Sequence, residues 1–174
     1  MKVFREVVLT VTFDINQDSQ LLQWVFTANG EPITGQGVET GLLAFKHYDK
    51  ITLVAVANSA KGDLQQIEIE DCHMITTPRA FTVRENPKKA GEFAEPSPFG
   101  HHSAVVSFGK GTIKGSSTQA QWNPDKQLDC THLGRWDMSL IITAAITRTG
   151  DTTGCPERRV FAFDPECEVG TGGG

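Results

Sequence analysis

Apolar and polar residues alternate with a period of two in this chain, and that spacing limits the folds it can adopt more than any other feature. The segment 6–14 is the clearest case, because its apolar residues include one set of alternate positions: Val7, Leu9, Val11 and Phe13. Successive side chains of an extended strand point to opposite faces, so the pattern predicts a strand with one apolar face. The pattern recurs at residues 51–58, 64–74, 136–148 and 158–163.

Turn signals separate these segments. Asn29-Gly30 is a residue pair that favours the two-residue turn of a hairpin. The stretch 86–100 contains three prolines and two glycines, and it predicts a long loop. Residues 51–58 carry apolar side chains on both faces, which indicates a central strand. About nine short strands without an amphipathic helix predict an all-β fold, a two-sheet antiparallel β-sandwich or jelly roll with little helix.

The length of 174 residues suits one domain with a single core. We assign the sandwich to residues 1–168 and interpret the glycine-rich residues 169–174 as a flexible tail. The composition, 39% apolar and 21% charged, is ordinary for a globular protein and excludes disorder as the main state.

Charge and hydropathy exclude two classes of partner. The net charge is -5 and the pI is about 5.5, so no basic surface is expected to bind the phosphates of a nucleic acid. No segment approaches the ~20 apolar residues that span a bilayer, so no membrane partner is expected. Arg5 and Glu6 stand where a signal peptide would need an apolar core, and the cytoplasm is therefore the expected compartment.

Four cysteines, Cys72, Cys130, Cys155 and Cys167, could form two disulfides in three connectivities. A strand over 158–163 extends ~20 Å, at ~3.3 Å per residue. A disulfide needs Cα atoms within ~7 Å, so Cys155 and Cys167 should not pair with each other. Free thiols also suit a reducing compartment, and we expect the cysteines to be reduced.

Histidine and cysteine neighbours form the sharpest candidate for a metal site. Thiolate and imidazole are preferred ligands of zinc and copper, and jelly-roll metalloenzymes take histidines from separate strands. No CxxC or HExxH spacing is present, so the alternative is a set of solvated imidazoles. The candidate ligands are His73, His101, His102 and His132, with Cys72 and Cys130 beside them.

Asp14, Asn16 and Asp18 have the alternate spacing of a calcium-binding loop. An EF-hand would next need Gly at position 19 and Glu at position 25, where this chain has Ser19 and Val25. The segment is therefore interpreted as a polar turn after the first strand, with a looser calcium loop as the alternative.

Trp24, Trp122 and Trp136 could form a stacking platform for a sugar or another small ligand if they lay exposed on one face. Burial in the core is the alternative. No GxSxG elbow or phosphate-binding loop is present, and Asp164 before Pro165 is interpreted as a turn residue. We predict no catalytic residue and no cofactor.

Three segments together resemble the bacterial inclusion-body protein family, the PixA/AidA group. They are VLTVTFDI at 8–15, TGQGVETGLLAF at 34–45 and LIITAAITRTGDTTGCPERRVFAFDP at 140–165. Their order and the total length are similar to those of the family. The resemblance implies an abundant cytosolic β-sandwich without established catalysis that self-associates in an ordered way, and it supplies no catalytic residues to transfer.

Three functions follow as hypotheses. The first is a non-enzymatic protein that self-associates as a homo-oligomer or binds a partner, because exposed strand edges offer unpaired N–H and C=O groups to a neighbouring copy. The second is a sandwich that binds a carbohydrate or another small molecule at the tryptophans. The third is a jelly-roll metal-dependent enzyme that uses the histidines.

Overall fold

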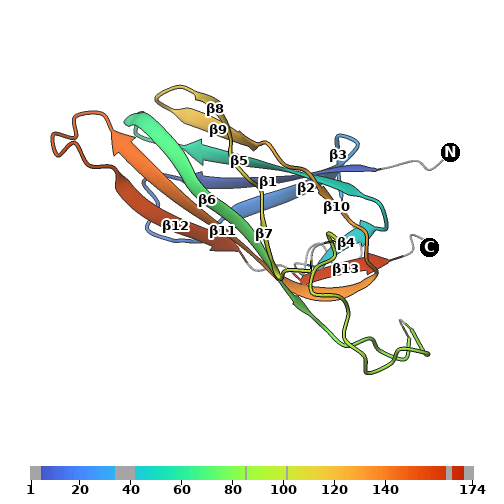
Figure 1. Ribbon diagram of the computed structural model, residues 1–174. Helices are drawn as coiled ribbons and strands as arrows, with labels where there is room; N and C mark the ends of the chain where they lie inside the picture. Colours follow the sequence, from blue (N-terminus) through green and yellow to red (C-terminus); the bar gives the residue numbers. More distant parts are fainter. Residues whose placement is uncertain (1–4, 34–41, 85, 101, 164–165, 171–174) are drawn as a thin grey trace.

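The computed structural model describes residues 5–33, 42–84, 86–100, 102–163 and 166–170 (Figure 1). Within these ranges the chain forms strands and no helix, so the predicted all-β fold is confirmed. The strands are β1 (Glu6–Asp14), β2 (Gln23–Ala28), β3 (Glu31–Pro32), β4 (Leu42–Lys46), β5 (Lys50–Asn58), β6 (Leu64–Pro78), β7 (Val105–Ser107), β8 (Gly111–Gly115), β9 (Gln119–Pro124), β10 (Leu128–Asp129), β11 (Gly134–Arg148), β12 (Glu157–Phe163) and β13 (Glu166–Gly170).

Two sheets contain the described strands and form the predicted sandwich. The seven-stranded sheet has the order β3-β2-β1-β5-β9-β8, and β10 also pairs with β5. The six-stranded sheet has the order β4-β13-β11-β6-β7, and β12 also pairs with β11. β13 continues to Gly170, beyond the boundary expected at residue 168. The long strands β6 and β11 pair along almost their whole length and form the middle of the second sheet.

Most described strand pairs are antiparallel, and β1–β5 and β4–β13 are parallel. Parallel neighbours cannot be joined by a hairpin and need a crossover connection. Between β1 and β5 the chain makes the β2–β3 hairpin and then passes through β4 in the other sheet. Asn29 and Gly30 form that hairpin turn with φ of 52° and 85°, which matches the predicted turn.

The core lies between the sheets, as the alternation predicts. Each expected inward residue of β1 is buried, and β5, with β1 on one side and β9 on the other, is the predicted central strand. Aromatic rings join the two sheets: Phe13 of β1 stacks on Phe161 of β12 with ring centroids 4.1 Å apart. Both rings are buried, and burial of such a side chain stabilises the fold by about 1.5–3 kcal/mol.

β6 changes the set of residues that faces the core at a β-bulge. Ile67 and Ile69 face inward before the bulge, and the inward set continues with Cys72 after it. The ladder with β11 passes from the pair Asp71–Thr143 to the pair Ile69–Ala144, which leaves Glu70 without a ladder partner, although its carboxylate accepts from Arg158. A bulge adds one residue to one strand only, so the inward positions change from odd to even.

Deletion of Glu70 should therefore be tolerated, whereas deletion of His73 should not. The first change removes the residue that has no ladder partner and keeps the other side chains on their faces. The second moves Met74 and the residues after it to the opposite face. In circular dichroism we expect a cooperative thermal transition for the Glu70 deletion and none for the His73 deletion. Loss of the transition in both variants would contradict this explanation of the face change.

Candidate functional site

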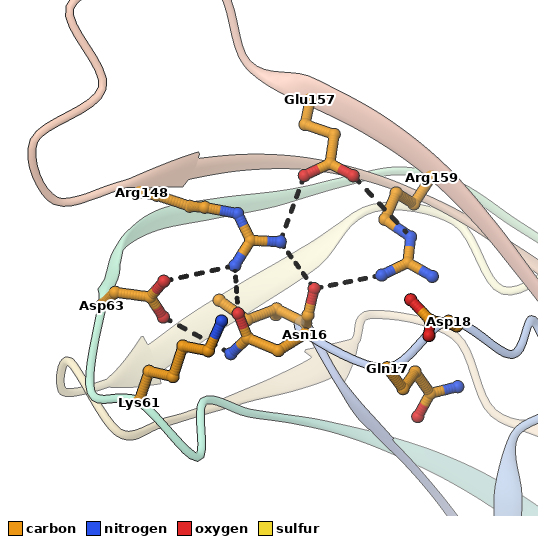
Figure 2. A pocket seen from close by; sticks show the side chains of 9 residues that line it. Asn16, Gln17, Asp18, Lys61, Asp63, Arg148, Glu157 and Arg159 are labelled. Atoms are coloured by element: carbon orange, nitrogen blue, oxygen red, sulfur yellow. Dashed lines mark hydrogen bonds and ion pairs between the residues drawn. The ribbon is translucent and has the colours of Figure 1, made fainter.

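A polar pocket opens at the end of the sandwich where β1 and β11 finish and β12 begins (Figure 2). Its volume is about 490 Å³, which is in the range of small-molecule sites. Its walls come from both sheets and from the connection between β5 and β6. The lining residues are Ile15, Asn16, Gln17, Asp18, Lys61, Asp63, Arg148, Glu157 and Arg159.

The two arginines of the pocket occupy inward positions of their strands. Arg148 lies two residues after the buried Ile146 in β11, and Arg159 lies two residues before the buried Phe161 in β12. Because side chains alternate along a strand, both arginines continue the inward set at the point where the apolar core ends. Each guanidinium therefore reaches the space between the sheets, close to the backbone that follows β1.

The Arg148 guanidinium donates hydrogen bonds to four groups (Figure 2). Nη1 donates to Asn16 Oδ1 at 2.6 Å and to Asp63 Oδ2 at 3.3 Å. Nη2 donates to the carbonyl oxygen of Ile15 at 2.7 Å and to Glu157 Oε2 at 3.1 Å. These acceptors belong to the ends of different strands, so one side chain joins both sheets at this end of the sandwich.

Arg159 shares an acceptor with Arg148. Its Nη1 donates to the Ile15 carbonyl oxygen at 3.0 Å, and its Nε lies 3.9 Å from Glu157 Oε1. The guanidinium carbon is 4.8 Å from the centroid of the Phe161 ring, a cation–π arrangement. Arg159 Nη2 has no protein partner among the described residues.

Asp63 is held as a carboxylate by hydrogen bonds. The Ser59 hydroxyl donates to Asp63 Oδ1 at 2.6 Å and accepts from the Asp63 backbone N–H at 3.0 Å. The bond from Ser59, together with those from Asn16 and Arg148, lowers the pKa of Asp63 below its usual value. Asp63 is therefore charged at neutral pH and balances part of the Arg148 charge.

The segment after β1 is a polar turn, as interpreted from the sequence. Asp14 Oδ1 accepts the backbone N–H of Asn16 at 2.7 Å, and its Oδ2 accepts that of Ala60 at 3.0 Å. The Asn16 side-chain oxygen, which a calcium loop would offer to the ion, accepts from Arg148 instead. Two of the three candidate calcium ligands thus have their oxygens engaged by protein groups.

Lys61 and Asp18 differ from the other charged residues of the pocket. Both are exposed, and neither charged group has a partner among the described residues. Figure 2 shows Lys61 on the side of Asp63 and Asp18 on the side of Arg159. The pocket thus combines a fixed network around Arg148 with two charges that remain available to solvent.

The three tryptophans belong to the core. Trp122 and Trp136 are buried, and the Trp136 indole N–H donates to the carbonyl oxygen of Glu95 at 2.7 Å. Trp24 is half-buried and stacks on Phe163 with ring centroids 5.7 Å apart. These rings do not form a shared exposed platform, and the alternative of buried aromatics describes their placement.

The candidate metal ligands are not brought together where they are described. Cys72 faces the core, and His73, the next residue of β6, lies on the opposite face with Nε2 3.4 Å from Asp71 Oδ1. His132 Nδ1 is 3.2 Å from the Ser97 carbonyl oxygen, and His102 is exposed. His101 lies outside the described residues. In the described ranges no group of three His, Cys, Asp or Glu residues is placed to hold a metal ion.

Three of the cysteines are free thiols, as expected: Cys72, Cys130 and Cys155. The side chain of Cys167 and the residues Asp164 and Pro165 lie outside the described part of the structure. Burial raises the pKa of Cys72 and of Cys130 far above the usual thiol range. Because the thiolate is the nucleophile, these two thiols are unreactive at neutral pH.

Sequence reasoning did not single out Lys61, Asp63, Arg148, Glu157 or Arg159. The sequence did contain a signal for the two arginines. Arg148 takes the inward position after the last inward apolar residue of β11, and Arg159 takes the inward position before the first one of β12. A charged residue at such a position must find partners or water at the end of the core. The turn residues Asn16 and Asp63 could not be assigned as those partners from spacing alone.

Comparisons with known proteins do not assign this chain to a family. Neither a scan against protein-family models nor a search of curated proteins found a match. Among the described residues no helix has the length and apolar character needed to cross a membrane.

Replacement of Asp63 by Asn should weaken the pH dependence of stability in acid. A lowered pKa in the folded chain stabilises the fold above the unfolded pKa, and that stabilisation is lost as the pH falls through the folded value. The wild-type melting temperature should therefore fall more steeply than that of Asp63→Asn below about pH 4. Scanning fluorimetry at a series of acidic pH values measures these melting temperatures. Asp18→Asn is the control, and its melting temperature should change with pH as that of the wild type does. Equal slopes for wild type and Asp63→Asn would contradict it.

Proposed function

We propose that this chain is a non-enzymatic, cytosolic β-sandwich protein of the inclusion-body type that associates with copies of itself through two free strand edges. One observation carries the proposal: β8 and the first half of β6 lie on the same side of the sandwich and border one groove. The resemblance of three segments to the inclusion-body family supports the same function.

β8 presents an unpaired backbone edge. It is the outermost strand of the seven-stranded sheet, and all of its residues are exposed. The turn that follows it is closed by the Ser116 N–H, which donates to the Gln119 carbonyl oxygen at 2.7 Å. Because hydrogen-bonded positions alternate in an antiparallel ladder, Ile113 directs its own N–H and C=O away from β9. These groups are available to a strand from another molecule.

The second edge belongs to β6. On the side opposite β11, β7 pairs only with residues 73–75, and residues 65–71 have no strand partner in the described part of the chain. Ile67 of this edge lines the groove together with Ile113 of β8, and Ile69 lies with both of them at a small apolar pocket beside it. The groove opens to a volume of about 360 Å³ beside the two edges. Glutamine and serine side chains line the groove beside these isoleucines. A groove with apolar and polar residues between unpaired edges suits an interaction surface.

The two edges carry exposed charges of opposite sign. Lys114 of β8 and Glu68 of β6 are exposed; Lys114 has no partner among the described residues, and Glu68 interacts electrostatically with Arg158 without a hydrogen bond to it. Lys114 and Glu68 each directly follow an isoleucine of the groove, so both point to the outer faces of their sheets. Pairing β8 of one copy with β6 of another places these charges on the same outer face, which favours a second copy as the partner.

Strand direction permits this pairing. β9 is antiparallel to both β5 and β8, so β8 runs in the same direction as β5. β6 follows β5 after the short connection 59–63 and returns in the opposite direction. A two-fold axis along the strands therefore sets β8 of each copy antiparallel to β6 of the other.

The described residues offer little for catalysis, and this supports a binding role. The two buried thiols have raised pKa values, and no described His, Cys, Asp and Glu residues form a metal cluster. The free thiols Cys72, Cys130 and Cys155 also suit the reducing cytosol.

Blocking the β8 edge should prevent association. Ile113→Pro removes the outward N–H without removing an intrachain ladder bond, while Ile113→Val keeps the edge intact. In light scattering over a concentration series, we expect the mass of the wild type and of Ile113→Val to rise with concentration and that of Ile113→Pro to remain monomeric. A wild type that is monomeric at every concentration would overturn the proposal.

A charge exchange tests the pairing of β8 with β6 directly. Lys114→Glu and Glu68→Lys should each raise the dissociation constant of the assembly about tenfold, equivalent to ~1.4 kcal/mol. The double variant Lys114→Glu/Glu68→Lys should recover most of the wild-type association in analytical ultracentrifugation. Failure of the double variant to recover would show that these edges do not face each other in the assembly.

A further inference from the structure

We propose that the polar pocket at the end of the sandwich binds the anionic group, a carboxylate or phosphate, of a small ligand through Lys61 and Arg159. This site is separate from the edges of β8 and β6, and it does not depend on self-association. Hydrogen-bond donors of Lys61 and Arg159 remain unused in the pocket after the contacts within the chain are made.

Arg148 is excluded as the binding group because both of its Nη atoms already donate to groups of the chain. It donates to Asn16, Asp63, Glu157 and the Ile15 carbonyl oxygen. Asp63 and Glu157 both contact Arg148, and Glu157 also lies 3.9 Å from Arg159 Nε, so the charges of this network are largely balanced and it does not itself attract an anion. Its effect is to hold the pocket walls in place before a ligand arrives.

Arg159 keeps donors that face the pocket. Its Nη1 is bound to the Ile15 carbonyl oxygen, and its plane lies over Phe161, so the direction of the guanidinium is set by the fold. Nη2 has no described protein partner. An arginine that is oriented in advance loses little side-chain entropy when an oxyanion binds it, which favours recognition of a carboxylate or phosphate.

Lys61 supplies the second donor group. It lies in the connection between β5 and β6 and lines the same pocket as Arg159 (Figure 2). Its ammonium group has three donors and no partner among the described residues. A ligand that enters this pocket therefore meets two cations with unused donors, one on each side of Asn16 (Figure 2).

Asp18 limits which anions fit. Its carboxylate lies on the Arg159 side of the pocket and has no partner, so it repels a simple anion bound there (Figure 2). A ligand with a hydroxyl or ammonium group beside its anionic group would satisfy Asp18 as well. The pocket volume of about 490 Å³ and the net charge of -5 favour a small ligand over a polyanionic chain.

Titration calorimetry with inorganic phosphate and with succinate, at constant ionic strength, tests the site. We expect binding of at least one of them when each is titrated to roughly 10 mM, which detects a Kd of about 1 mM. Binding of phosphate alone would identify a phosphate ligand, and binding of succinate alone a carboxylate ligand. Absence of binding by both anions would overturn the proposal.

Three variants locate the binding. Lys61→Gln should raise the Kd of the bound anion about fivefold, which is the upper range for a partly exposed charge pair. Lys88→Gln, the same change in the loop before β7, should leave it unchanged. Asp18→Asn should lower the Kd of the anion, because a carboxylate that repels the anion is removed. Equal affinities of the wild type and Lys61→Gln would overturn the proposal, and none of these residues lies in the edges that are proposed for self-association.

Discussion

The stack of Phe13, Phe161 and Arg159 connects the interior of the sandwich with its polar end. Phe13 and Phe161 join the two sheets by burying their rings against each other. Arg159 covers the Phe161 ring and donates to the backbone oxygen of Ile15, two residues after Phe13. The position of the pocket is therefore set by the same contacts that hold the sheets together. A change in sheet spacing would move the guanidinium and the apolar core as one unit.

The two proposed surfaces occupy different parts of the sandwich. The groove between β8 and β6 opens along one side, where both sheets have unpaired backbone, whereas the polar pocket lies at the end of the strands. They approach each other at the start of β6, since Asp63 lines the pocket and Leu64 lines the groove. The chain can thus pair with another copy along its side while the pocket remains open at its end.

The sequence predicted the sandwich because burial on one face of a strand is visible as a period of two. β1, β5 and β12 follow the predicted alternation without interruption. It could not predict the bulge at Glu70, because an extra residue in a ladder depends on the partner strand. The pocket was missed for a related reason: Arg148 and Arg159 continue inward sets, but their acceptors come from turns whose meeting depends on the tertiary fold.

The pocket residues differ in how much the fold depends on them, and this difference determines which of them can be substituted. Arg148, Asp63 and Asn16 are fixed by mutual hydrogen bonds, and loss of any one removes hydrogen bonds from the other two at the junction of the sheets. Lys61 and Asp18 make no such contacts, so substitutions there leave the scaffold intact. Substitution of these two residues would therefore change the charge of the proposed ligand pocket and leave the packing of the two sheets unchanged.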